Sequence, residues 1–447
     1  MSPKENTVSS STLPIENLSL GTRINWLLVG AVVLTFTNGL VISLLVFPSV
    51  SGPTGIATGS SDGWAEIAAN IIKGTGFVYD PWAAPSPSTG YLAREPIYAL
   101  FLASLLAVFG DLEPSMMLLQ ALANAITCFV LYSVVRKTFN RQAALIACFF
   151  YALYPFASWY VPRIAYETLL GLLVTLLALG LVNLFEDLSF RRSLTLGFIL
   201  GITVLCKGTY LLLPVALVPA LIIRFGVWNT RAIWCWATIV LTMVSLLSPW
   251  VVRNYAVSGE FVPLTTHGGA AFFYGDKLIE HYSLRENTAG ELPGEESTQL
   301  YNNVRDSIRS QNPHFSHAKV EVEVDKELVR TAIANALTDP MKFAKKILLG
   351  LGFVWFLGDT AVKSTALLAM QGPLVLLSLV GIFYAVRFKK QVLPLLTLLV
   401  YFAVIQVAFV ALGRFSYPMV PILVAFAAYA VEIFRSKYLQ LGVGAVE

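Results

Sequence analysis

The amino-acid sequence predicts an all-α protein, a polytopic membrane bundle of about 10–13 membrane helices with juxtamembrane helices on its outer side. Hydrophobic residues make up 56% of the 447 residues and charged residues only 13%, against roughly 25% charged residues in a soluble domain. The mean hydropathy is +0.69, and apolar runs recur along the whole chain. We therefore expect membrane lipids as partners and no nucleic acid.

The apolar runs predict about ten full crossings, because a spanning helix needs about 20 apolar residues. The candidate spans are 25–47, 115–135, 142–160, 165–185, 193–206, 209–224, 231–252, 367–386, 392–411 and 415–434. The first run lacks an A-x-A cleavage site, which favours a retained helix over a signal peptide. Two shorter apolar stretches, 97–110 and 343–358, are expected to cross only partially.

Basic residues in the short loops predict the orientation, because cytoplasmic loops are enriched in Lys and Arg. They include Lys4, Arg23, Arg136, Lys137, Arg141, Arg191, Arg192, Arg224, Arg231, Arg387, Lys389, Lys390, Arg435 and Lys437. Both termini are then cytoplasmic, with a flexible tail at 1–22, a membrane domain at 23–436 and a second tail at 437–447. All four cysteines fall inside apolar runs, which predicts buried free thiols.

Two long segments are expected on the outer face, 48–96 and 253–342. In the second, the spacing of Leu328, Ile333 and Leu337 predicts a helix. That helix should end near Asp339, because a proline follows. We expect these segments to form lids and acceptor-binding surfaces over the bundle.

The stretch 62–73 in the first outer segment predicts an amphipathic helix. Trp64, Ile67, Ala68 and Ile71 fall on one face, while Asp62, Glu66, Ala69 and Lys73 fall on the other. Such a helix can lie flat on the membrane with Trp64 at headgroup level, and Gly74 with Gly76 would end it. Two interpretations of Asp62 stay open and are compatible: an N-cap of this helix, and a carboxylate that faces a reaction cavity.

Basic side chains from distant parts of the chain are expected on the same outer face. They are Arg94 before the helix that begins at Pro96, Lys207 in a tight turn between apolar helices, Arg253 and Arg414. Cations at that depth suit a lipid phosphate. The alternative for Arg94 and Lys207 is a side chain that snorkels to the headgroups. Further candidates for binding sugar or acceptor are Glu95, Tyr98, Arg163, Glu167, His267 and Tyr274.

These stretches resemble the GT-C superfamily of membrane glycosyltransferases, and most closely its dolichyl-phosphate-mannose protein mannosyltransferase and lipid A aminoarabinose transferase branch. The matching residues cover about 25–436: Asp62 with "KGTGF" at 73–77; Arg94, Pro96 and Tyr98; Glu167 in "YETLL"; Gly201, Leu205, Lys207 and Gly208; Pro249, Trp250, Arg253, Asn254, Tyr255, Gly259, Phe261, Val262 and Pro263; and Gly413, Arg414, Phe415, Pro418 and Pro421. The chain departs from the pattern at Glu95, where many relatives have another residue.

The resemblance implies an inverting transfer of a monosaccharide from a polyprenyl-phosphate donor to a lipid, glycan or protein acceptor. Lys207, Arg94, Arg253 and Arg414 would bind the donor phosphate, Asp62 would act as the base, and Glu66 or Glu167 would position sugar or acceptor. No cofactor is certain, and a divalent cation at Asp62 and Glu66 stays open. The expected location is the bacterial inner membrane, with the site on its outer face.

Two other classes of function remain as alternatives. A transporter or flippase for a lipid-linked sugar would also need a cavity with phosphate-binding cations. The sequence shows no paired half-helix interruptions, the usual sign of a secondary transporter. A purely structural membrane subunit explains neither Lys207 nor the ordered motifs.

Overall fold

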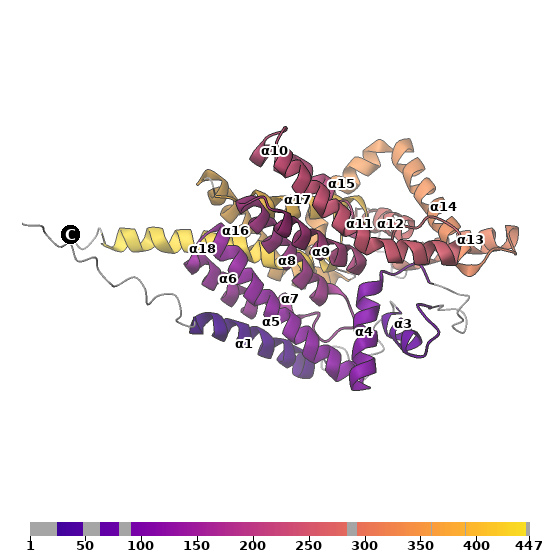
Figure 1. The fold of residues 1–447 in the computed structure, drawn as a ribbon, viewed down its shortest axis with the longest axis horizontal. Coiled ribbons are helices and arrows are strands. Elements are labelled where there is room, and N and C mark those ends of the chain that lie inside the picture. Colours follow the sequence, from indigo (N-terminus) through magenta and orange to yellow (C-terminus); the bar gives the residue numbers. More distant parts are fainter. Residues whose placement is uncertain are drawn as a thin grey trace, which may run out of the picture.

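The structure is a computed structural model that describes residues 25–47, 63–79, 91–283, 293–358, 360–388 and 390–443. These residues form helices joined by short connections, and the helices gather into an elongated bundle (Figure 1). The predicted all-α polytopic fold is confirmed.

Seven segments of the described chain are long and apolar enough to cross a membrane. They are α1 (Trp26–Val41) with the π-helical η1 (Ile42–Val46), α5 (Leu112–Thr138), α8 (Glu167–Glu186), the 3-10 turn η2 (Gly208–Tyr210) with α10 (Leu213–Phe225), α11 (Thr230–Ser258), α16 (Ala361–Arg387), and the 3-10 segment η3 (Gly413–Met419) with α18 (Val420–Val443). Shorter helices accompany them: α4 (Pro96–Phe109), α6 (Arg141–Leu153), α7 (Pro155–Ser158), α9 (Phe190–Cys206), α15 (Pro340–Phe356) and α17 (Leu393–Ala408).

The predicted spans and the observed helices differ in length at several places. The stretch 142–160 was expected to cross without a break, but α6 ends at Leu153 and Tyr154 is extended. Pro155 follows, and a residue before proline avoids the α conformation. Likewise, 392–411 contains the 16-residue α17. The short stretches 97–110 and 343–358 form the 14-residue α4 and the 17-residue α15, which agrees with their predicted shortness.

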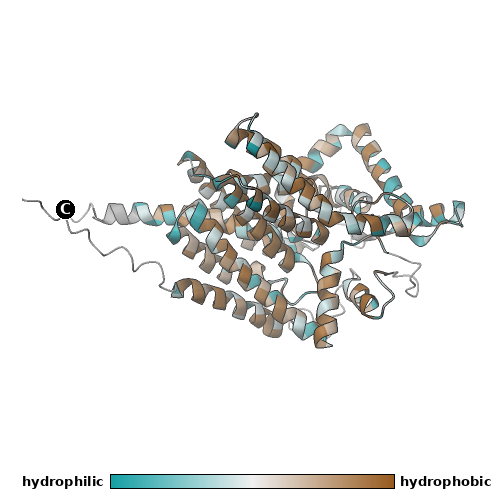
Figure 2. Ribbon diagram, viewed as in Figure 1, coloured by the Kyte–Doolittle hydropathy of each residue, from teal (hydrophilic) through white to brown (hydrophobic). Residues whose placement is uncertain are grey.

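Burial separates central helices from peripheral ones. The apolar window of the η3–α18 segment is 83% buried within the protein, whereas those of α11 and α16 are 22% buried. Since α11 and α16 remain apolar on their open faces, these faces suit contact with lipid. Figure 2 shows this hydrophobic colour on helices throughout the bundle. All four cysteines are buried free thiols, as predicted.

The basic loops meet at one end of the bundle. Lys137 at the end of α5 pairs with Glu186 of α8 at 2.7 Å. Arg231 at the start of α11 lies 3.6 Å from Asp187, and Arg435 of α18 donates to Gln142 of α6. The side of the membrane that this end faces stays a prediction.

At the other end of the bundle lie α3 (Trp64–Ile72), α12 (Gly268–Ser283), α13 (Pro293–Gln311) and α14 (His317–Thr338) (Figure 1). The predicted helix ahead of Pro340 is confirmed, because α14 ends at Thr338 with Asp339 as its C-cap.

The helix predicted at 62–73 is confirmed as α3, but its predicted environment is wrong. It starts at Trp64 after Gly63, and Gly74 follows in the left-handed region at φ 78°. Trp64 is 1% exposed, with its ring edge-on to those of Tyr98 and Tyr166. The apolar face thus packs against protein, chiefly α4, and Trp64 does not lie at headgroup level.

Candidate functional site

Lys207 occupies the turn between α9 and η2, as the sequence predicted. Its extended backbone ends α9, and its ammonium lies 4.7 Å from the centre of the Tyr166 ring and 6.0 Å from that of Phe415. Aromatic faces attract a cation without neutralising it. The turn therefore presents a positive group that can still bind an anion.

Glu95 connects this turn to the start of α4. Its carboxylate is 6% exposed and accepts a 2.7 Å hydrogen bond from the Gly208 N–H. A Cβ on Gly208 would lie 3.2 Å from that same oxygen, so the glycine allows the close approach. Glu95 also lies within electrostatic range of Lys207. The sequence predicted Glu95 as a residue that binds sugar or acceptor, and its contact with the turn at 207–208 was not predicted.

Arg94 lies beside the same cluster. Its guanidinium is 5.8 Å from the centre of the Trp64 ring, and one of its N–H groups donates to the Ala93 carbonyl at 3.0 Å. Arg94 is also among the charges that act on Lys207. Two cations from segments more than a hundred residues apart are thus brought together. The negative charge of Glu95 acts on Lys207 as well.

Glu167 and Arg414 form an ion pair across the bundle. Glu167 opens α8 and is 1% exposed, while Arg414 lies in η3. One Glu167 oxygen accepts from the Arg414 Nε, whereas the other is buried with no hydrogen-bond partner among the described residues. The predicted outer turn at Arg414 and the predicted acidic residue at Glu167 therefore meet, although their pairing was not predicted.

Two of these groups, Lys207 and Glu167, line a small pocket with room for about one water molecule, about 10 Å³, whereas Arg94, Glu95 and Arg414 are not among its lining residues. Its lining combines aromatic rings, hydroxyls and one ammonium: Tyr166, Glu167, Leu170, Lys207, Thr209, Tyr210, Gln406, Phe415 and Pro418. Tyr166, Thr209 and Phe415 were missed by sequence reasoning as site residues. The only signal for Tyr166 and Phe415 was their place next to Glu167 and Arg414 in the motifs.

Arg253 uses its donors within the protein. One nitrogen donates to the Tyr91 carbonyl at 2.8 Å and the other to the Phe77 carbonyl at 2.9 Å. The guanidinium also lies 4.8 Å from the centre of the Trp250 ring. These contacts fix residues 77 and 91 to the end of α11. They favour a structural role, and phosphate binding by Arg253 stays a prediction.

The other predicted site residues are spread around this end of the bundle, and none of the following lines the pocket. Arg163 lies over the rings of Phe47, Trp159 and Tyr160. Tyr98 is fully buried beneath Trp64. Glu66 is exposed on α3, His267 is exposed just before α12, and Tyr274 packs partly buried in an apolar cluster with Leu278.

Asp62 lies outside the described residues, so its role as base or cap stays a prediction. The cation suggested for Asp62 and Glu66 is untested for the same reason. Among residues whose placement the structure describes, no three His, Cys, Asp or Glu side chains lie grouped as metal ligands.

Comparison with known proteins adds a family match over part of the chain and a fold. Residues 93–252, which carry Arg94, Glu95, Glu167 and Lys207, match the family model of dolichyl-phosphate-mannose-protein mannosyltransferase. Among curated proteins, none matches the chain by sequence.

Two solved structures from Archaeoglobus fulgidus superpose on most of the chain. One is the oligosaccharyltransferase AglB with an inhibitory peptide and a dolichol-phosphate, at a TM-score of 0.56 and 16% identity over 95% of this chain. The other is an oligosaccharyltransferase tethered to an acceptor peptide, at a TM-score of 0.55 and 15% identity over 92% of this chain. The chain has the same fold as these two oligosaccharyltransferase structures. The predicted resemblance is confirmed.

The chain spans about half the length of those structures, 52% and 50% respectively. ArnT from Cupriavidus metallidurans bound to undecaprenyl phosphate also matches, with 16% identity over 89% of this chain and 77% of its own. Its TM-score of 0.40 is too low to establish a common fold, so the two archaeal structures carry the comparison.

Proposed function

We propose that the protein is a membrane glycosyltransferase that moves a hexosyl or pentosyl unit from a polyprenyl-phosphate carrier to an acceptor. The observation that carries the proposal is the pocket lined by Lys207, with Arg94 and the Glu167–Arg414 pair beside it. The cluster lies where the mannosyltransferase family model matches, except for Arg414. Solved structures of the same fold hold dolichol-phosphate and an acceptor peptide, which supports a lipid-linked donor.

In this proposal the cations act on the leaving group. The bond between the anomeric carbon and the phosphate oxygen breaks, and its electron pair leaves with the polyprenyl phosphate. Lys207 and Arg94 stabilise the negative charge that builds on that phosphate, where fixed positive groups contribute most to catalysis. Both cations are half-buried, which strengthens this effect, because the local dielectric is lower than that of water.

The acceptor oxygen forms the new bond from the opposite side, so one displacement inverts the anomeric configuration. Its proton passes to a carboxylate, since a general base must accept it. Glu167 is paired with Arg414 and Glu95 holds the Gly208 N–H. Asp62 therefore remains the proposed base, with Glu66 of α3 as its alternative.

The acceptor would be a hydroxyl or phosphate of a lipid, a glycan or a protein. We place the reaction on the outer face of a bacterial inner membrane, because the pocket and the basic loops lie at opposite ends of the bundle and basic loops are cytoplasmic.

Sugar transfer in membranes tests the proposal directly. Labelled polyprenyl-phosphate monosaccharides would be offered to extracted cellular acceptors with the wild type, Asp62→Asn and Lys207→Ala. Lys137→Ala, which alters a lysine at the opposite end of the bundle, is the matched control. We expect transfer by the wild type and the control, and a loss of about 100-fold or more in each site variant.

The outcomes separate the alternatives. Full transfer by Asp62→Asn would return Asp62 to a helix cap and move the search for the base to Glu66. If the wild type transfers no sugar from any donor but moves lipid-linked sugar across the bilayer, the flippase interpretation replaces the transferase.

A further inference from the structure

An outer helix reaches back to the segment that carries Arg94 and Glu95. Glu321 of α14 is 6% exposed, and its Oε2 accepts a 3.0 Å hydrogen bond from the Leu92 N–H. Its other oxygen lies 3.2 Å from the His317 Nε2. The contact joins residues 229 positions apart, so the local sequence does not form it.

The backbone around Leu92 is fixed by three hydrogen bonds from other parts of the chain. Leu92 is fully buried, and a buried N–H without a partner is costly, so Glu321 satisfies an obligatory donor. The Leu92 carbonyl accepts from the Thr266 N–H at 3.1 Å. The preceding carbonyl, that of Tyr91, accepts from Arg253. Arg94 and Glu95 follow within three residues of this anchored point.

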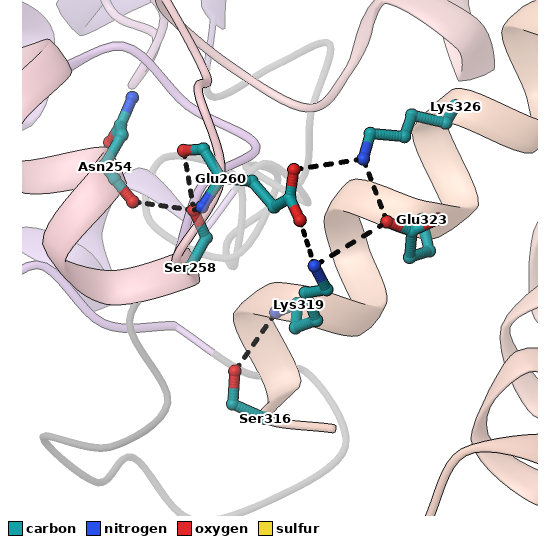
Figure 3. Close-up of polar contacts among 7 residues, drawn as sticks. All are labelled: Asn254, Ser258, Glu260, Ser316, Lys319, Glu323 and Lys326. Atoms are coloured by element: carbon teal, nitrogen blue, oxygen red, sulfur yellow. Dashed lines mark hydrogen bonds and ion pairs between the residues drawn. The ribbon is translucent and has the colours of Figure 1, made fainter. Parts of the chain in front are cut away.

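The helix that supplies Glu321 is itself fixed to the end of α11 (Figure 3). Glu260, two residues beyond α11, accepts hydrogen bonds from Lys319 and Lys326 of α14. Glu323 accepts from Lys326 at 2.9 Å. Ser258, the last residue of α11, accepts from the Glu260 N–H and so holds the turn. These contacts hold α14, and with it Glu321, in place independently of the contact between Glu321 and Leu92.

We propose that Glu321 is a positioning residue for the donor site. By holding the Leu92 N–H it fixes the backbone from which Arg94 reaches the phosphate and Glu95 reaches the turn of Lys207. This inference rests on the proposed function, because the positioned groups are those assigned to the donor phosphate. Glu321 itself would touch neither donor nor acceptor.

The positioning role of Glu321 depends on whether its side-chain oxygen reaches the Leu92 N–H, and not on its charge. In Glu321→Gln the amide oxygen can still accept from Leu92. In Glu321→Asp the charge is kept, but the carboxylate is withdrawn by about 1.5 Å, one carbon–carbon bond. The matched controls are Glu327→Gln and Glu327→Asp, since Glu327 is exposed on the same helix and pairs with Arg330 at 3.4 Å.

The experiment measures sugar transfer and binding of undecaprenyl phosphate by the purified full chain, using quenching of tryptophan fluorescence for binding. We expect Glu321→Asp to raise the donor KM and the Kd for undecaprenyl phosphate about tenfold, the loss of one hydrogen bond to a charged acceptor. The acceptor KM should stay within about twofold. Glu321→Gln and both Glu327 variants should remain close to the wild type.

The reverse order, with Glu321→Gln impaired and Glu321→Asp intact, would overturn the inference in favour of a charge effect on Arg253 or His317. Equal donor KM and Kd in all folded variants would overturn it as well. Should Glu321→Asp misfold, an impaired Glu321→Gln overturns the inference and an intact one supports it. A wild type that binds undecaprenyl phosphate but transfers no sugar would instead count against the proposed function.

Discussion

At the scale of single residues, the Glu167–Arg414 pair makes the sharpest prediction. Glu167 is 1% exposed, and one of its oxygens has no hydrogen-bond partner in the part of the chain that the structure describes, so its charge depends on Arg414. Arg414→Gln should lower the free energy of unfolding by about 3 kcal/mol, because it leaves a buried charge without its partner. Thermal or denaturant unfolding in detergent would measure the change.

The double variant Glu167→Gln/Arg414→Gln provides the control for this pair. Removing both charges together is expected to recover most of the lost stability, since two neutral groups carry no uncompensated charge. If the single and double variants were equally destabilised, the loss would come from packing and not from the pair.

The residues themselves were predictable, and their partners were not. The sequence placed Lys207 in a tight turn and Arg94 ahead of a helix, because glycine, proline and apolar runs mark such positions locally. The bond between Glu95 and Gly208 joins residues 113 positions apart, and it depends on how α4 packs against α9. Periodicity carries no information on such packing, so Tyr166 and Phe415 were missed as well.

At the scale of elements, the glycine pair at the start of α12 makes a matched comparison. A Cβ on Gly269 would lie 2.6 Å from the Asp325 carbonyl oxygen of α14, whereas a Cβ on Gly268 would have no atom of the described residues within 4 Å. Gly269→Ala should therefore force α12 away from α14 at a cost of about 1–3 kcal/mol. Gly268→Ala should leave the melting temperature unchanged, and equal melting of both variants would contradict the close approach.

Asp325 gives the same contact a dependence on pH. Burial raises the pKa of its carboxyl above the ordinary value, although the Gly269 N–H that it accepts acts in the opposite direction. The folded state then binds the proton more tightly than the unfolded state. Stability should rise as the pH falls from neutral through the raised pKa, and be lost again as the pH rises.

Asp325→Asn tests this sign, because the amide oxygen keeps the bond to Gly269 and cannot titrate. The variant should melt at a higher temperature than the wild type at pH 7.5, and this difference should shrink toward pH 5. A difference that is constant over that range would show that Asp325 does not titrate with folding.

Elements differ in how far the sequence determined them. The helix before Pro340 was predicted because proline sets its boundary, and α3 was predicted because its glycines set its end. The environment of α3 was not, because an amphipathic helix packs equally well on a membrane surface and on another helix. The side chains that pack against Trp64 of α3 are Tyr98 and Tyr166. Neither belongs to residues 62–73, so the sequence of that segment could not reveal this environment.

At the scale of the whole molecule, the asymmetry of charge predicts how the protein sits in the membrane. Lys137, Arg231 and Arg435 meet at one end of the bundle, and Lys207 with its pocket lies at the other. Enrichment of basic residues marks the cytoplasmic end. The pocket should therefore open to the outside, where a lipid-linked donor and not a nucleotide sugar would serve it.

Single cysteines introduced at the two ends measure this orientation. The native cysteines are buried, so a membrane-impermeant maleimide should not react with them. Ser307→Cys on α13 should react in intact cells, because Ser307 is exposed beside the outer helices. Trp228→Cys, at the 89% exposed tip between α10 and α11, should react only after the membrane is opened. The opposite pattern would place the pocket in the cytoplasm and rule out the outer-face reaction, while leaving the fold and the cation cluster unchanged.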